Sequence, residues 1–340
     1  EQYPRKIKIY EYKPYLFPIE MDRGTFMFAK QLPTESEHLL SGYNNYALTK
    51  VTFRYAVKVD ADQVYFSQYW DRLCNAYRST AQTTPNSIER IAFKLYRSYI
   101  RLFTKDSLSN CLLRKVTILL YPFYFSYIEK IVIRDKVSVS LSGINLCYLD
   151  DQWTVSLGLK GGKELFPLFN GVHDTFFFEL SSDTFYEKWC KEGNSPGQYR
   201  ILEIMKYRKE ILEAGFLWFH MKPTMRYMAG QTRTLYEKYP NRFVPLHRLK
   251  IMPYKQFCRS YHPFFILFEA SFSYFFYVQR KRIPWNILAF LEKQYNRNMS
   301  MDLHYDRDYY LEYQEELDKR IEQFLQHWET GNLISLGEHS

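Results

Sequence analysis

The residues best suited to chemistry in this chain are basic side chains that recur along one predicted helix. Residues 86–105 follow Pro85 and carry apolar residues at helical spacing, so they predict an amphipathic helix. Five cations, spaced four, three, four and four residues apart, would share the face opposite the apolar stripe: Arg90, Lys94, Arg97, Arg101 and Lys105. A row of like charges repels itself unless something anionic lies across it.

Three kinds of anionic partner would satisfy this basic row. They are RNA phosphate, anionic lipid head groups, and an acidic protein surface such as the predicted helix 306–329 of the same chain. Residues 302–329 hold nine acidic residues against three basic ones, so this helix has the required sign of charge. A helix face that is merely solvated is the alternative interpretation of the row.

A second basic segment, residues 222–259, holds nine Lys or Arg residues against Glu237 alone. Four prolines in it argue against a long helix, and aromatic residues are interleaved with the cations. This pattern predicts an extended segment in a crevice, with cations on phosphates and rings stacked on bases or wedged against a neighbour. A long loop that covers the chain's own core is the alternative. The predicted contacts with an anionic partner here are Arg226, Arg233, Lys238, Arg242, Arg248, Lys250, Lys255 and Arg259.

Catalytic and metal-binding signatures fail on inspection. The glycine-rich segment 158–163 resembles a phosphate loop, but Leu157 replaces a required glycine and Glu164 replaces the Ser or Thr that holds magnesium. The eight His residues form no pair at metal-ligand spacing, and Asp-x-Asp pairs such as 60–62 and 306–308 are common by chance. We therefore predict no catalytic residue, no cofactor, no metal site and no small-molecule substrate. An enzyme of unrecognised fold that depends on His304 and Asp306 remains a third hypothesis.

Composition narrows the class of protein and its compartment. The 340 residues carry 46 Lys or Arg and 37 Asp or Glu, and a mean hydropathy of −0.42 excludes a multi-span membrane protein. Five widely spaced cysteines exclude a disulfide framework and favour a reducing compartment: Cys74, Cys111, Cys147, Cys190 and Cys258. The chain begins with Glu1 rather than Met, which removal of a mitochondrial transit peptide would explain; preceding residues that are simply missing are the alternative.

The helices and strands predicted from the sequence patterns indicate an α+β fold. We expect it to be helix-dominant, with a small antiparallel sheet or hairpin in the N-terminal half and aromatic-rich helices in the C-terminal half. The predicted regions are an irregular N-terminal arm (1–48), a mixed α/β region (49–181) with the basic helix 86–105 and a hairpin at 137–159, a mainly helical region (182–330) that contains the extended segment 222–259, and a C-terminal tail (331–340).

Individual segments carry their own predictions. Alternating apolar residues predict a strand at 50–59, and the paired Asp150 and Asp151 suit a hairpin turn. Helices are predicted at 64–79, 183–192, 198–220, 263–282 and 306–329. Residues 262–278 are too few for a membrane span and include Glu269, which favours a buried helix over contact with the bilayer.

Together these patterns predict a non-catalytic accessory subunit of a large mitochondrial multiprotein assembly. Tyr and Arg are enriched at protein interfaces, and a self-repelling basic surface needs a covering partner. We expect an inner-membrane respiratory-chain or ATP synthase complex, on the matrix side or associated with the inner membrane, with other protein subunits as partners and possible contact with anionic lipid. The alternative is an RNA-contacting structural protein of the mitochondrial ribosome.

Overall fold

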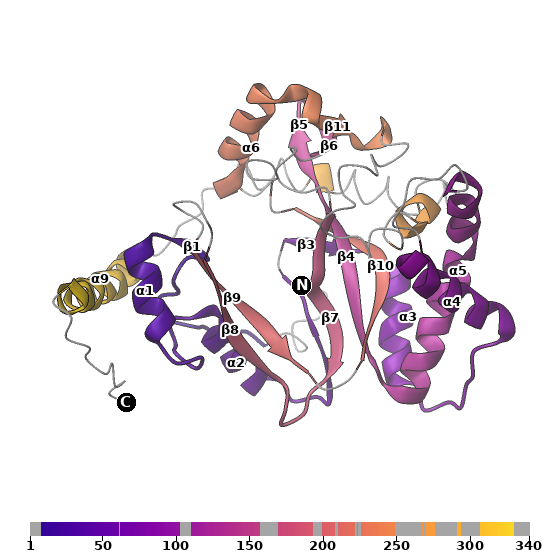
Figure 1. Cartoon of the computed structure of the whole chain (residues 1–340), viewed down its shortest axis with the longest axis horizontal. Coiled ribbons are helices and arrows are strands. Elements are labelled where there is room, and N and C mark those ends of the chain that lie inside the picture. Colours follow the sequence, from indigo (N-terminus) through magenta and orange to yellow (C-terminus); the bar gives the residue numbers. More distant parts are fainter. Residues whose placement is uncertain are drawn as a thin grey trace. The chain divides into compact units, whose positions relative to one another are not determined.

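The computed structural model divides the chain into two compact units (Figure 1). Unit 1 consists of residues 1–54, 180–208 and 302–340, and unit 2 consists of residues 55–179 and 209–301. The structure describes residues 8–60, 62–102, 110–156, 169–192, 199–207, 210–221, 223, 226–248, 267, 270–275, 291–293 and 307–329.

Unit 1 is built on a three-stranded antiparallel sheet in the order β1-β9-β8. Its elements are β1 (Glu20–Met21), α1 (Arg23–Gln31), α2 (Leu40–Thr49), β8 (Phe185–Lys191), β9 (Tyr199–Lys206) and α9 (Arg307–Glu329). The Asp22 carboxylate accepts a hydrogen bond from the Thr25 amide at 3.0 Å and so caps α1. Burial of Phe26, Phe28 and Leu317 joins α1, α9 and the sheet in one core.

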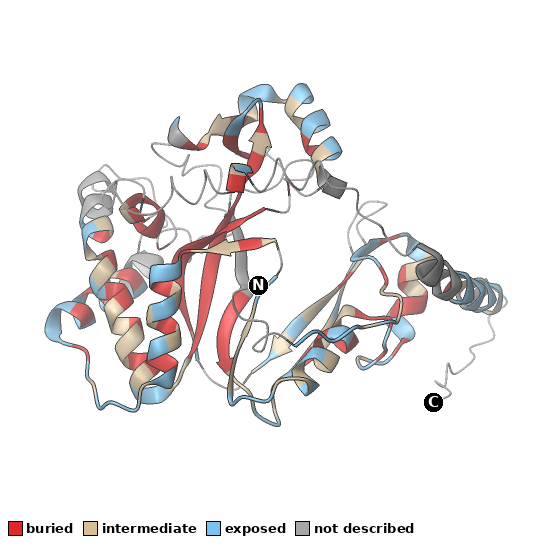
Figure 2. Cartoon of the chain, turned by 180° about the vertical axis from the view of Figure 1, so that it is seen from behind, coloured by how far each residue is buried: buried red, intermediate tan, exposed pale blue. Residues whose placement is uncertain are grey.

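Unit 2 contains a five-stranded mixed sheet in the order β2-β7-β4-β10-β3. Its strands are β2 (Tyr55–Lys58), β3 (Gln63–Tyr65), β4 (Ser138–Asn145), β7 (Phe169–Glu179) and β10 (Ile211–His220). Only the central pair β4–β10 is parallel; the other neighbours are antiparallel. Figure 2 shows β4 and β10 as largely buried, which fits central strands that are covered on both faces.

Three helices of unit 2 pack together beside this sheet (Figure 1): α3 (Ser67–Arg78), α4 (Ser87–Leu102) and α5 (Asn110–Asp135). The α5 helix contacts α3, α4 and β10, and α3 also packs on the sheet through Trp70 and Tyr77, whose rings contact Phe177 of β7. Two hydroxyls on α5, those of Tyr121 and Tyr124, donate to the backbone oxygens of Ala214 and Glu213 on β10 at 2.8 and 2.6 Å. Aromatic rings dominate the core beneath these helices, with Phe125 fully buried against Tyr69.

A smaller three-stranded sheet, β11-β6-β5, completes the described part of unit 2. Its strands are β5 (Cys147–Leu149), β6 (Gln152–Ser156) and β11 (Phe243–Pro245), and α6 (Arg226–Lys238) contributes Leu235 and Tyr236 to their apolar cluster. Asp150 and Asp151 join β5 to β6 with φ angles of 48° and 56°, so the predicted hairpin turn is confirmed. The first strand of the hairpin is short, because residues 138–145 belong to the five-stranded sheet instead.

The predicted fold class is wrong. The chain is not helix-dominant with one small sheet, because three sheets are present and one of them has five strands of mixed direction. The error lies in the C-terminal half: segments 183–192 and 198–220, predicted as helices, form β8, β9 and β10. Strand β10 is buried over almost its whole length, so its apolar run shows no alternation, and such a run cannot be told from a buried helix by periodicity alone.

Proline misled the prediction at two further places. In segment 222–259, residues 226–238 form α6 rather than an extended chain, because Pro223 and Pro240 flank this helix and do not interrupt it. In the predicted irregular arm 1–48, Pro14, Pro18 and Pro33 likewise lie outside α1 and α2. Residues 249–259 lie outside the described residues, as do 1–7 and the tail 331–340.

The α5 helix was not predicted. Pro122 lies inside this helix, and the apolar residues of α5 are distributed around its whole circumference. The helix therefore lacks the one-sided apolar stripe from which α4 was predicted. Its segment Val116–Asp135 is long and apolar enough to cross a membrane, although core helices of soluble proteins meet the same criteria. One side of this segment is buried in unit 2, where Tyr121, Phe125 and Ile128 are fully buried, whereas Leu119 and Phe123 are exposed.

The remaining predictions meet the structure only in part. Helices predicted at 86–105 and 306–329 correspond to α4 and α9. Of the apolar segment 262–278, the structure describes Leu267 and residues 270–275; Leu267, Phe272 and Phe275 lie in the core of unit 2. Cys74, Cys147 and Cys190 are free thiols.

Candidate anion-binding pocket

The start of α4 is fixed by a reciprocal pair of hydrogen bonds. The Glu89 amide donates to the Asn86 side-chain oxygen at 2.9 Å, and the Asn86 amide donates to the Glu89 carboxylate at 2.7 Å. This is a capping box, which satisfies two amides that the first turn of a helix leaves without partners. The polar residue after Pro85 therefore sets where α4 begins and the direction in which it leaves the preceding loop.

The same carboxylate ties α4 to α5. Glu89 is 3 % exposed and accepts hydrogen bonds from Ser126 at 2.7 Å and from Lys130 at 2.9 Å. Burial by itself would raise the pKa of Glu89, but the hydrogen bonds from Lys130, Ser126 and the Asn86 amide outweigh burial and lower the pKa. Because this ion pair is largely buried, it holds the two helices in one register.

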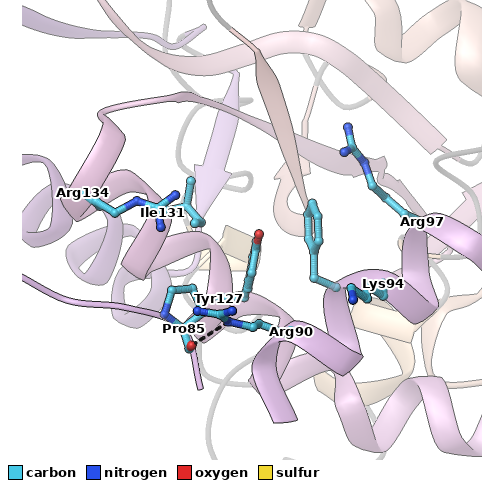
Figure 3. A pocket seen from close by; sticks show the side chains of 8 residues that line it. Pro85, Arg90, Lys94, Arg97, Tyr127, Ile131 and Arg134 are labelled. Atoms are coloured by element: carbon cyan, nitrogen blue, oxygen red, sulfur yellow. Dashed lines mark hydrogen bonds between the residues drawn. The ribbon is translucent and has the colours of Figure 1, made fainter. Parts of the chain in front are cut away.

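A pocket of about 460 Å³ lies beside this junction (Figure 3). Four of its lining residues are cations, three from α4 and one from the last turn of α5. The lining residues are Pro85, Arg90, Phe93, Lys94, Arg97, Tyr127, Ile131 and Arg134. No carboxylate is among them, so the pocket presents positive charge only.

Two of these cations are engaged by carboxylates nearby. Arg97 lies 2.5 Å from Glu210, and Arg134 lies 2.6 Å from Asp135. In contrast, among the described residues no carboxylate pairs with Arg90 or Lys94; Arg90 donates only to the backbone oxygen of Pro85, at 3.0 Å. Both side chains belong to exposed residues. The pocket therefore keeps about two uncompensated positive charges, which is the property required to attract an anion.

Aromatic rings form the floor between the cations. Phe93 on α4 and Tyr127 on α5 stack with ring centres 4.2 Å apart and an angle of 18° between their planes. The Arg97 guanidinium lies 5.2 Å from the centre of the Phe93 ring, within the range of a cation–π contact. The ring pair therefore joins α4 to α5 beside the cations that line the pocket.

The structure brings together three of the predicted contact residues, Arg90, Lys94 and Arg97, and adds Arg134, which the prediction missed. Arg134 was missed because its helix was not predicted, although residues 86–136 hold ten Lys or Arg against four Asp or Glu. Arg101 lies in α4, and Lys105 lies outside the described residues.

The predicted contacts around α6 are arranged differently. Arg233 pairs with Asp150 at 2.7 Å and with Glu237 at 3.1 Å, so both sides of its guanidinium are occupied by carboxylates. The Lys238 ammonium lies 5.0 Å from the centre of the Tyr239 ring. Arg226 begins α6, and Arg242 and Arg248 lie in the 3₁₀ turns Pro240–Arg242 and Leu246–Arg248. Lys250, Lys255 and Arg259 lie outside the described residues.

A second polar cluster lies where the parallel strands β4 and β10 end. The Nδ1 atom of His220 is 2.5 Å from the Asn145 side-chain oxygen, and its Nε2 atom is 3.3 Å from an Asp62 carboxylate oxygen. These contacts link the ends of both strands to the β2–β3 connection. Within the described ranges, no group of three or more His, Cys, Asp or Glu residues is placed to hold a metal ion. His304 and Asp306 lie outside those ranges.

Comparison with known proteins assigns the chain to no family. No family model, no curated protein and no solved structure matches the chain.

Proposed function

We propose that the chain is a non-catalytic accessory subunit of a mitochondrial multiprotein assembly at the inner membrane, of the respiratory-chain or ATP synthase class, and that it joins this assembly through an anionic partner. The observation that supports the proposal is the pair Arg90 and Lys94, which line a pocket without a compensating carboxylate in the described part of the chain. Leaving such charges uncovered beside Arg97 and Arg134 is unfavourable, and an anion in the pocket relieves the repulsion.

A second function is favoured by one specific observation. The stacked pair Phe93–Tyr127 lies among the cations, and single-stranded RNA is bound by aromatic rings and basic side chains in combination. The alternative is therefore an RNA-contacting structural protein of the mitochondrial ribosome. In this case the partner in the pocket is a phosphodiester and not a lipid or a protein carboxylate.

Purification of the tagged full-length chain from mitochondria tests both functions. We expect co-purifying proteins to survive nuclease treatment and to be lost from the variant Arg90→Glu/Lys94→Glu. The matched control is Arg23→Glu/Lys191→Glu, which makes the same change of charge at two exposed positions of unit 1 and should retain the proteins. Retention of the same proteins by the pocket variant would overturn the role of the pocket, and loss of the partners on nuclease treatment would favour RNA.

A further inference from the structure

The exposed face of α4 carries apolar side chains as well as cations. Ile88 is 50 % exposed and Ile91 is 54 % exposed, although both are aliphatic residues on a helix that has a buried core-facing side. Ile91 lies three residues before Lys94 on the helix, so the two side chains are neighbours on its surface. Ile91 is therefore next to Lys94 on the exposed surface of α4, and Ile88 lies three residues before Ile91 on the side farther from Arg90 and Arg97.

The neighbouring helix adds two further exposed apolar residues. On α5, Leu119 is 62 % exposed and Phe123 is 40 % exposed. Along the chain they fall between two residues of α5 that contact α4, since Tyr96 donates to the Thr117 backbone oxygen and Phe93 stacks with Tyr124, but at helical spacing they lie on a different face of α5 from these two. We call the set Ile88, Ile91, Leu119 and Phe123 the apolar rim of the α4–α5 hairpin.

A partner that covers this surface must be anionic and apolar together. RNA supplies phosphates and stacking bases, but it has no aliphatic surface for isoleucine and leucine. The interface of a phospholipid bilayer supplies both, because phosphates lie directly above the acyl chains and apolar side chains enter the boundary while cations meet the head groups. Of these two partners, the bilayer therefore matches both the positive charge and the exposed apolar side chains of α4 and α5.

We infer that the α4–α5 hairpin of unit 2 contacts an anionic phospholipid surface, with a lipid phosphate beside Arg90 and Lys94 and the apolar rim at the acyl boundary. The inference rests on the proposed function, for which it names the partner of the pocket. It does not require α5 to span the bilayer. The core-facing side of α5 stays packed in unit 2, and only side chains that are already exposed meet lipid.

Co-sedimentation of the full-length chain with vesicles tests this contact. We expect binding to vesicles of phosphatidylcholine with phosphatidylglycerol and none to phosphatidylcholine alone. Neutralising two cations in Arg90→Gln/Lys94→Gln should weaken vesicle binding by about tenfold or more. The apolar variant Ile88→Gln/Ile91→Gln should also weaken vesicle binding, while its binding to inorganic polyphosphate stays unchanged because the cations remain.

The matched control replaces two exposed isoleucines of unit 1, in Ile19→Gln/Ile204→Gln, and should bind vesicles like the unaltered chain. Equal losses in the control and in the apolar variant would overturn the assignment of the rim. Binding to polyuridylate RNA without binding to anionic vesicles would overturn the lipid inference and leave an anionic partner in the pocket. Failure of vesicles, RNA and polyphosphate alike to bind at Arg90 and Lys94 would overturn the inference together with the proposed function.

Discussion

The α4 helix and the α6 helix both come from basic parts of the chain, yet their cations differ in how they are paired. On α4, Arg90 and Lys94 line a pocket without a carboxylate partner in the described structure. On α6, Arg233 lies between Asp150 and Glu237. Net charge along the sequence therefore does not measure the charge that is available for a partner.

The difference arises from what each helix packs against. The α6 helix lies beside the β5–β6 hairpin, whose turn presents Asp150 to both Arg233 and Tyr236. Hydrogen bonds from Tyr236 and Arg233 lower the pKa of Asp150, so this carboxylate stays ionised and keeps the arginine occupied. The α4 helix packs against α5, whose carboxylates Glu129 and Asp135 pair with Arg72 and Arg134. Neither carboxylate pairs with Arg90 or Lys94.

The largest predicted effect concerns the core that supports both helices. Glu213 is buried in β10, and this burial raises the pKa of Glu213 from 4.5 to about 8. The folded state holds this proton more tightly than the unfolded state, so stability falls as pH rises from 4.5 through 8. Each tenfold change in acidity is worth about 1.4 kcal/mol, so the loss amounts to several kcal/mol.

Urea unfolding at a series of pH values measures this loss. In Glu213→Gln we expect a shallower dependence on pH and a more stable protein at the alkaline end. Equal pH dependence in the variant and the unaltered chain would show that Glu213 is not the group that titrates. Since both α4 and α6 belong to unit 2, alkaline conditions should weaken the two regions together.

The next effect separates the two regions. Glu89→Ala removes the capping box of α4 and leaves Lys130 without its buried partner, so the free energy of unfolding should fall by about 3 kcal/mol. In the unaltered chain this contribution is present above pH 4.5 and is lost as pH falls through the lowered pKa of Glu89. Urea unfolding at neutral and at acidic pH checks both statements.

The control for this prediction is Asp150→Asn, which removes the charge of an exposed carboxylate beside α6 and suits the positive φ of this turn position. Exposed ion pairs contribute little to stability, so its unfolding midpoint should stay close to that of the unaltered chain. A similar loss of stability in both variants would remove the contrast between a buried junction at α4 and a surface contact at α6.

A smaller effect concerns binding. Arg90→Gln/Lys94→Gln should weaken binding of inorganic polyphosphate by about tenfold, because it removes the two cations that have no carboxylate partner. Arg233→Gln should change the affinity by less than about twofold, since Asp150 and Glu237 already compensate the guanidinium. Titration calorimetry at two salt concentrations measures both, and equal losses would contradict the contrast.

The smallest predicted effect comes from a variant in which Arg233 on α6 lacks carboxylate partners, as Arg90 and Lys94 on α4 do. Asp150→Asn/Glu237→Gln leaves Arg233 without carboxylate partners, so affinity for polyphosphate should rise about two- to threefold and its salt dependence should steepen by about one charge. An unchanged affinity would show that pairing with carboxylates is not what separates α6 from α4.

Part of the candidate site was predictable. The spacing of Arg90, Lys94 and Arg97 placed them on one face, and the capping residues after Pro85 marked the start of the helix. Arg134 was not predictable without α5, because a helix that is apolar on all sides and contains Pro122 lacks the periodic signal. The occupied state of Arg233 was out of reach as well, since Asp150 lies 83 residues away in sequence.

By itself the sequence determined the local elements whose signals are short in range: the α4 cap, the Asp150–Asp151 turn and the long acidic helix α9. Tertiary structure alone decided that 211–220 is a strand, because burial on both faces removes the alternation that distinguishes a strand from a helix. It also decided which cations remain available. Ion pairing depends on distances in space, and net charge along the chain carries no information about those distances.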